Sequence, residues 1–167
     1  MKFPRETTGP ILTLVLLVCL LFPALVYAAR GLPGKAFGEI LPENIQWAPF
    51  PAFPPSVRLA VLVGDTNTSS PYVVRVKVPD GVKLLPHVHP EDRIYTVMSG
   101  VFYIGIGDKF AVEKLKAYPP GSVIVLPGNT PHFHWAKSGE YVTQVTANGP
   151  LGIDYVNPHD DPRKGAP

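Results

Sequence analysis

Four of the five histidines lie in two short stretches, and their spacing could build a metal site. His87 and His89 are two residues apart, so in an extended strand both imidazole rings leave the same face. The second stretch, residues 121–134, can return His132 to the same place. Neutral imidazoles that converge on one point bind divalent transition metals and leave coordination positions open. The spacing therefore predicts a metal bound by His87, His89 and His132.

The residue types do not select one metal. Imidazole ligands suit Zn, Fe, Ni, Cu and Mn, so the identity of the divalent transition metal stays open. Taken alone, the pattern His87-Val88-His89 is also compatible with two ordinary surface histidines on a strand. The metal interpretation is favoured only when His132 returns to the same face.

The elements that would position these residues are short strands. Apolar residues alternate or run in short blocks that are separated by Gly and Pro turns. The predicted strands span 57–63, 72–78, 83–89, 94–99, 101–106, 122–126, 132–136 and 141–146. Residues 109–117 are predicted as one short helix, and residues 45–50 as an edge strand. Many short strands with frequent turns predict an all-β fold, either a closed barrel or a double-sheet jelly roll.

The N-terminal segment is typical of a secretion signal. Lys2 and Arg5 precede an almost wholly apolar run at 11–26, which is short for a membrane span, and a cleavage site follows at Ala28. The sequence therefore predicts a signal peptide at 1–28 and a periplasmic or secreted protein without a stable membrane span in its mature form. An uncleaved anchor is the alternative.

The rest of the chain is expected to form one domain. A Pro-rich arm at 29–56 precedes a barrel at 57–156 and a polar, extended tail at 157–167. The lone Cys19 lies inside the apolar run, so the mature chain has no disulfide bond or thiolate chemistry. The formal net charge is only +2 and there is no basic run, which argues against nucleic-acid binding.

The two histidine stretches resemble the two motifs of the cupin superfamily, G-x5-H-x-H-x(3,4)-E-x6-G and G-x5-P-x-G-x2-H-x3-N. The matching positions are Gly81, His87, His89, Gly100, Gly121, Pro127 and His132. More narrowly, the chain resembles small exported bacterial cupins of unassigned activity. The resemblance implies a double-stranded β-helix with a metal at the mouth of the barrel. It also implies a small-molecule ligand or substrate, and a homodimer that pairs through edge strands or terminal segments.

Three positions depart from the family motifs: Arg93 replaces the glutamate ligand, Asn129 replaces a glycine and Ala136 replaces an asparagine. A guanidinium group stays charged and cannot bind a cation, so a three-histidine site remains. Arg93 has two interpretations. It could form a salt bridge with an acid such as Glu91 or Asp92, or it could reach into the barrel mouth and bind an anionic substrate.

Other candidate residues follow from their position and parity. Glu91 lies in a predicted turn and is expected to face water, with metal binding as the less favoured alternative. His134 shares the side of His132 and could be a ligand, a hydrogen-bond donor to one or a pocket wall. A satisfied interior histidine is the favoured interpretation. Tyr95 and Gln144 are candidate substrate-binding residues. No catalytic residue is identified.

These observations support two hypotheses from different classes. The first is a metal-dependent enzyme, a dioxygenase, isomerase or hydrolase, that acts on a small anionic substrate. The second is a non-catalytic module that binds a small ligand or the metal itself, because no residue is a clear general base. A metal-free structural barrel is a weaker third alternative.

Overall fold

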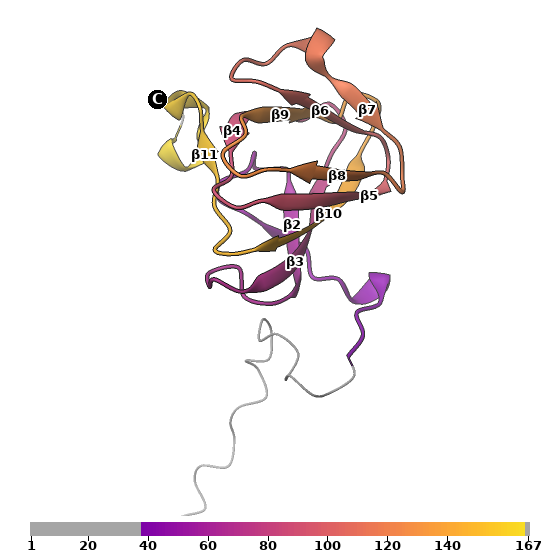
Figure 1. The fold of residues 1–167 in the computed structure, drawn as a ribbon. Helices are drawn as coiled ribbons and strands as arrows, with labels where there is room; N and C mark the ends of the chain where they lie inside the picture. Colours follow the sequence, from indigo (N-terminus) through magenta and orange to yellow (C-terminus); the bar gives the residue numbers. More distant parts are fainter. Residues whose placement is uncertain (1–37, 166–167) are drawn as a thin grey trace, which may run out of the picture.

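The computed structural model describes residues 38–165, whose strands form two antiparallel sheets (Figure 1). The predicted signal peptide and residues 29–37 of the Pro-rich arm lie outside the described residues. The first sheet has the order β1 (Ala48–Pro49), β2 (Arg58–Val63), β3 (Pro71–Val78), β10 (Tyr141–Asn148), β5 (Arg93–Ser99) and β8 (Val123–Leu126). The second has the order β11 (Asp154–Tyr155), β4 (Lys83–Val88), β9 (His132–Trp135), β6 (Phe102–Ile106) and β7 (Lys116–Tyr118).

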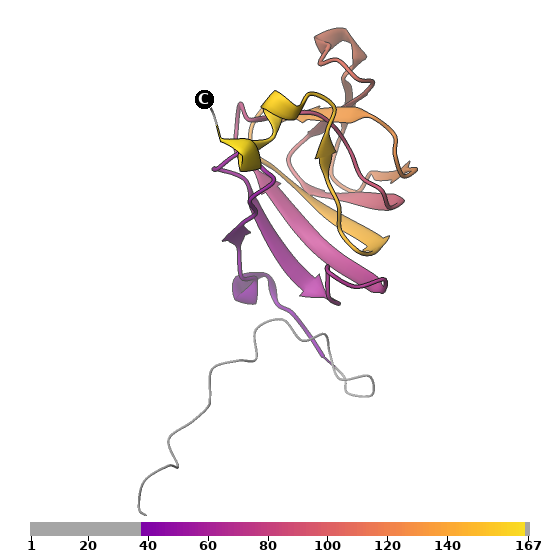
Figure 2. The same ribbon diagram turned by 90° about the vertical axis from the view of Figure 1, so that its left-hand side faces the viewer.

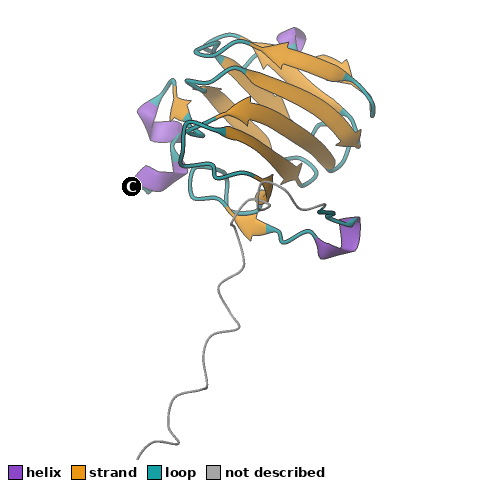
Figure 3. Cartoon of the chain, turned by 60° about the horizontal axis from the view of Figure 1, so that its bottom comes forward, coloured by secondary structure: helices purple, strands orange, loops and turns teal. Residues whose placement is uncertain are grey.

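The chain passes repeatedly from one sheet to the other, which makes a jelly roll. Strands β3, β5, β8 and β10 belong to the first sheet, and β4, β6, β7, β9 and β11 to the second. The predicted all-β jelly roll is confirmed. Figure 3 shows that the helical turns lie outside the sheets, and none of the described helices is long and apolar enough to cross a bilayer.

The core lies between the inner faces of the two sheets. In β3 the buried residues alternate with half-buried ones, as predicted for a strand with one face in the core. Its partner β10 alternates in the same way, and the register places Val74 opposite Val145 and Val76 opposite Thr143. Each fully buried valine of this kind stabilises the fold by about 1.5–3 kcal/mol.

The helix predicted at 109–117 is wrong. A single 3-10 turn covers Val112–Lys114, and β7 follows at once and pairs with β6. Phe110 packs instead on the outer face of the second sheet, where its ring centroid lies 4.9 Å from that of Phe133. The apolar spacing that suggested a helix therefore comes from Phe110 on the sheet surface, from Val112, which is exposed, and from Leu115, which is half-buried.

The C-terminal segment packs against the barrel, where Figure 2 shows it facing the viewer. Strand β11 pairs with β4, and two 3-10 turns follow at Pro158–Asp160 and Pro162–Lys164. Arg163 fixes the second turn, because it bonds to Asp161 and donates through Nη2 to the carbonyl oxygen of Ile153 at 2.9 Å. The segment that the sequence suggested would be extended is thus folded back.

Candidate metal centre

Two neighbouring strands of the second sheet bring the histidines together. His87 on β4 is the direct partner of His132 on β9, and His134 follows two residues later on the same face. The pairing of β4 with β9 shifts register between Leu84 and His87, and this bulge turns both residues inward although their positions differ in parity. His89 lies just beyond the end of β4. All four histidines are buried.

Three of the histidines form a tight group. One ring nitrogen from each of His87, His132 and His134 lies within 4.8 Å of the others. The Nε2 atoms of these three residues are buried and have no hydrogen-bond partner in the part of the chain that the structure describes. Because buried polar atoms are nearly always paired, these three unpaired nitrogen atoms form a group that could hold a metal ion.

The opposite ring nitrogens fix the tautomer of the histidines. Nδ1 lies 2.7 Å from the carbonyl oxygen of Leu85 in His87, and 2.8 Å from that of Thr130 in His132. Nδ1 of His89 lies 2.5 Å from the carbonyl oxygen of Gly152. A carbonyl oxygen only accepts, so Nδ1 carries the proton and the lone pair sits on Nε2. This is the form that binds a metal.

Burial also keeps the rings neutral. Desolvation lowers the pKa of His132 to about 4. It lowers the pKa of His87, His89 and His134 well below the ordinary value, and the nearby charge of Arg93 adds to the effect. A ligand must be unprotonated to bind a cation, so the donor set fits a divalent metal at neutral pH.

His89 lies beside the tight group rather than within it. The group whose nitrogen atoms lie within 4.8 Å of one another does not include it, although its ring centroid, 5.0 Å from that of His87 and 5.1 Å from that of His132, is as near to both as that of His134. The structure therefore brings the predicted residues His87, His89 and His132 together, and it adds His134 on the other side. The expectation of a satisfied His134 is wrong, because its Nε2 has no partner and its Nδ1 lies 3.5 Å from the Tyr141 hydroxyl.

Glu91 points into the protein, contrary to the expectation that it faces water. Its side chain is only 7% exposed and forms a salt bridge with Arg93. It also accepts a hydrogen bond from the Tyr72 hydroxyl at 2.7 Å and one from the backbone N–H of Gly152 at 3.3 Å. These contacts satisfy the carboxylate within the part of the chain that is described, away from the tight histidine group.

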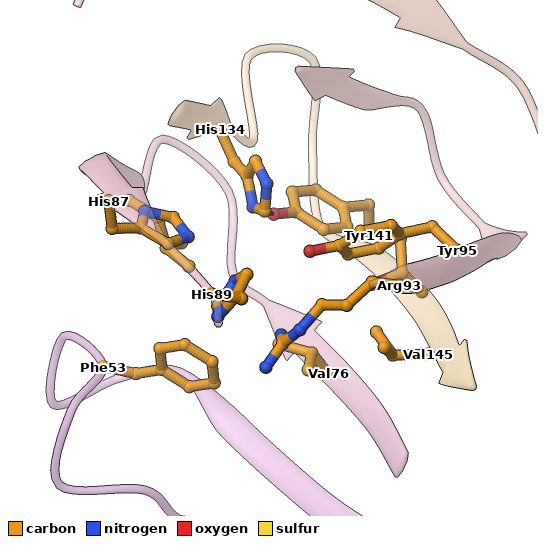
Figure 4. Close-up of a pocket in the computed structure, with 11 residues that line it drawn as sticks. Phe53, Val76, His87, His89, Arg93, Tyr95, His134, Tyr141 and Val145 are labelled. Carbon is orange, nitrogen blue, oxygen red and sulfur yellow. Dashed lines mark hydrogen bonds between the residues drawn. The ribbon is translucent and has the colours of Figure 1, made fainter. Parts of the chain in front are cut away.

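Arg93 combines both interpretations offered by the sequence. It forms the salt bridge with Glu91, yet it is 3% exposed and lines the same pocket as His87 and His89 (Figure 4). Its Nη2 group also donates to the carbonyl oxygen of Gly152 at 3.2 Å. The guanidinium thus takes the place of the family's carboxylate at the edge of the histidine cluster.

Tyr95 and Gln144, the candidate substrate-binding residues, lie on different sides of their strands relative to the pocket. Tyr95 lines the pocket and is buried, as Figure 4 shows. Gln144 does not, because it lies on the outer face of β10, where it accepts a hydrogen bond from Arg75 at 3.1 Å. Its neighbour Thr143 lines the pocket instead. Strand β10 begins at Tyr141, so the inward positions are the odd-numbered ones.

Sequence reasoning missed Gly152. Its carbonyl oxygen contacts His89 and Arg93, and its N–H contacts Glu91. A Cβ atom at this position would lie 2.6 Å from the ring of Pro90, so glycine is required for the close approach. No local pattern signals a contact between segments that are about 60 residues apart.

Comparisons with known proteins define the fold. No protein-family model and no curated protein matches the chain. The polyketide cyclase RemF from Streptomyces resistomycificus superposes with a TM-score of 0.63 at 16% identity, over 77% of this chain and 92% of that one. A cupin 2 conserved barrel protein from Rhodopseudomonas palustris gives 0.56 at 14% identity, over 74% and 87%. The DMSP lyase DddQ from Ruegeria pomeroyi gives 0.55 at 18%, over 67% and 61%.

These likenesses and the sheet topology show that the chain has the cupin fold, the double-stranded β-helix of the cupin superfamily. Two of the similar structures are named as enzymes, a cyclase and a lyase. At these identities the likeness establishes the fold and not the activity.

Proposed function

We propose that the chain binds one divalent transition metal through its histidine cluster and acts as a metal-dependent enzyme on a small anionic substrate. The metal is held by Nε2 of His87, His132 and His134, with His89 as the fourth ligand. The observation that carries the proposal is the group of three buried Nε2 atoms without partners. Zn, Fe, Ni, Cu and Mn are all compatible with imidazole ligands.

The histidine ligands would leave a bound metal ion its full positive charge. Four neutral imidazoles contribute no negative charge, so a bound divalent ion keeps its charge toward substrate. Such an ion acts as a Lewis acid or lowers the pKa of bound water. The buried Arg93 stands at the edge of the same pocket and favours an anionic substrate. The dioxygenase, isomerase and hydrolase reactions all remain candidates.

A metal analysis of purified, untagged protein tests the metal. One equivalent of metal per chain is expected, and the variant His87→Ala should lose it. His159→Ala is the matched control, because this histidine is exposed and lies in the C-terminal segment. Protein that never retains a stoichiometric metal, after exposure to each of the five ions, would contradict the proposal.

Oxygen-uptake and hydrolysis assays with each metal restored test the enzyme. One specific observation favours the alternative, a non-catalytic module that binds a small ligand or the metal. Glu91, the acid nearest the site, is fully engaged by Tyr72, Arg93 and Gly152 and is not free to act as a base. Metal-loaded protein that turns over no member of a broad panel of small carboxylic acids would support the binding module.

We also propose export and dimer formation, which rest on the sequence. Terminal sequencing of the mature protein should begin after Ala28, and intact residues 1–28 would indicate an anchor instead. Light scattering at micromolar concentration should give the mass of a homodimer, and the mass of a single chain would contradict this.

A further inference from the structure

A groove lies between the free edges of the two sheets, and it shares no lining residue with the histidine pocket. Strand β7 is the edge of the second sheet and β8 that of the first, and Figure 1 shows both on the same side of the barrel. The groove has a volume of about 480 Å³, which is in the range of small-molecule sites. Three strands each contribute two residues whose side chains leave one face, Ile104 and Ile106 from β6, Lys116 and Tyr118 from β7, and Ile124 and Leu126 from β8.

The floor of the groove is apolar. Ile104 and Leu126 are each 4% exposed, and Ile124, on the same face of β8 as Leu126, is half-buried. Ile106, at the end of β6, is 52% exposed, so a large apolar side chain meets the solvent at the opening of the groove. A ligand with an apolar segment would remove this surface from water, which is favourable.

Two ammonium groups stand at the groove without an anionic partner. Lys114, from the 3-10 turn, and Lys116 both line the groove and are exposed. Neither forms a salt bridge within residues 38–165, and no acidic residue lines the groove. Nζ of Lys116 lies 5.1 Å from the ring centroid of Tyr118, which holds this ammonium group against the groove wall. A positive rim beside an apolar floor complements a ligand that has an anionic head and an apolar tail.

Charge and hydrogen bonding disfavour the other occupants. A two-fold axis through the groove would bring Lys114 and Lys116 close to the same residues of a second copy, and like charges repel. Residues 29–37, outside the described part of the chain, hold Arg30 and Lys35 and no acid, so the rim would repel that segment as well. A peptide backbone on the floor would lose its hydrogen bonds to water, because the apolar side chains there offer none in return.

We infer that the groove between β7 and β8 is a second binding site, which takes an amphipathic anion such as a medium-chain fatty-acid anion. The apolar tail lies on Ile104, Ile124 and Leu126, and the anionic head lies at Lys114 and Lys116. This site goes beyond the proposed metal centre, and binding to it requires no metal.

Calorimetric titration of purified, untagged protein with hexanoate, octanoate and decanoate, each below its micelle-forming concentration, tests the site. One equivalent per chain is expected, and each added CH₂ group should raise the affinity about fourfold, the usual worth of a buried CH₂ group. The affinities should be the same before and after treatment with a chelator. An affinity that does not rise with the length of the tail would overturn the inference. Binding that disappears on chelation would overturn it too, because the anion would then occupy the metal centre.

Ile106→Glu should weaken octanoate binding by about tenfold or more, because it places a negative charge at the opening of the groove. Val61→Glu is the matched control, since this valine of β2 is 41% exposed and does not line the groove. Urea denaturation shows whether both variants are folded. An equal loss of octanoate affinity in the two variants would indicate unspecific binding to the barrel and would contradict the site.

Replacement of both lysines tests the anionic head. The double variant Lys114→Gln, Lys116→Gln should weaken octanoate binding by about twofold to thirtyfold, the worth of two exposed charge pairs. The same variant should leave the affinity for 1-octanol, the neutral analogue, unchanged. Both lysines are exposed, so we expect the variant to fold. Unchanged octanoate affinity in this variant would overturn the inference, and so would a wild-type dimer that binds none of the three anions.

Discussion

The carbonyl oxygen of Gly152 accepts a hydrogen bond from Nδ1 of His89 at 2.5 Å, although 63 residues separate them in the sequence. The same oxygen accepts from Arg93 at 3.2 Å. One backbone group of the C-terminal segment thus orients both a candidate ligand and the residue that replaces the family's acidic ligand. The geometry of the site depends on where this segment lies.

Gly152→Ala should weaken metal binding and lower stability. The added Cβ would lie 2.6 Å from two ring carbons of Pro90, and a proline ring cannot turn away. The segment must therefore shift and loosen its bond to His89. We expect metal affinity to fall by about tenfold to a hundredfold, as for other partners of metal ligands. We also expect the unfolding free energy to fall by about 1–3 kcal/mol. Competition with a chelator and urea denaturation measure the two effects, and wild-type values for both would show that the contact is unimportant.

His134→Ala should reduce metal affinity more than His89→Ala does. The nitrogen of His134 belongs to the tight group, whereas His89 lies beside it. Both variants should still fold, because each leaves the His87–His132 pair in place. Metal titration of the two variants shows which of the two histidines contributes more to metal affinity. Greater loss in His89→Ala would assign the site to the triad predicted from the sequence.

The metal-free protein should lose stability as the pH falls from about 6.5 toward 4. In the unfolded chain the histidines bind protons near their ordinary pKa of about 6.5. Burial lowers the pKa of His132 to about 4 in the folded protein, and it lowers the pKa of His87 in the same direction. The unfolded state therefore binds more protons in this range, so acid favours unfolding, by about 1.4 kcal/mol per pH unit for each such histidine. Above pH 6.5 both states are neutral and the effect disappears.

Urea denaturation of the metal-free protein at a series of pH values measures this slope. His132→Gln should reduce it. His159→Gln is the control and should leave it unchanged, because that histidine is exposed. A stability that is flat between pH 6.5 and 4.5 would be inconsistent with buried neutral histidines.

Arg93 and Glu91 should be strongly coupled. Removal of either partner leaves the other charge buried and unpaired, which typically costs about 3–5 kcal/mol. Arg93→Met and Glu91→Gln should each be strongly destabilised, and the double variant should be closer to the wild type than the sum of the two. A double-mutant cycle by urea denaturation measures the coupling. Additive effects would mean that the pair contributes no interaction energy.

The sequence predicted the fold and the location of the site well, because both depend on regular spacing. Alternation in 72–78 predicted β3, and two motifs predicted that the histidine stretches meet. Asn129, where the family has glycine, has a positive φ of 58°, which asparagine tolerates. The predictions that failed concern contacts between side chains, which the spacing of residues in the sequence does not indicate. Glu91 turns inward because Tyr72 and Arg93 bind it.

The wrongly predicted helix at 109–117 and the outward side of Gln144 have related causes. The strand β7 forms because β6 offers a partner for residues 116–118, and this pairing is a tertiary contact. The start of β10 at residue 141 was predicted correctly, but the sequence did not indicate that the odd-numbered residues of this strand face the core. The sequence indicated which histidines meet, but it did not indicate their hydrogen-bond partners.

The pairing of β11 with β4 sets the order in which the centre can be assembled. Tyr155 lies opposite His87 in this pairing, and Gly152, just before it, contacts His89. Both residues join the growing chain more than 60 residues after His87 and His89. We therefore expect the growing chain to enclose the site only after synthesis has passed residue 155. If the proposed metal binds, it would enter the closed barrel and not the growing chain.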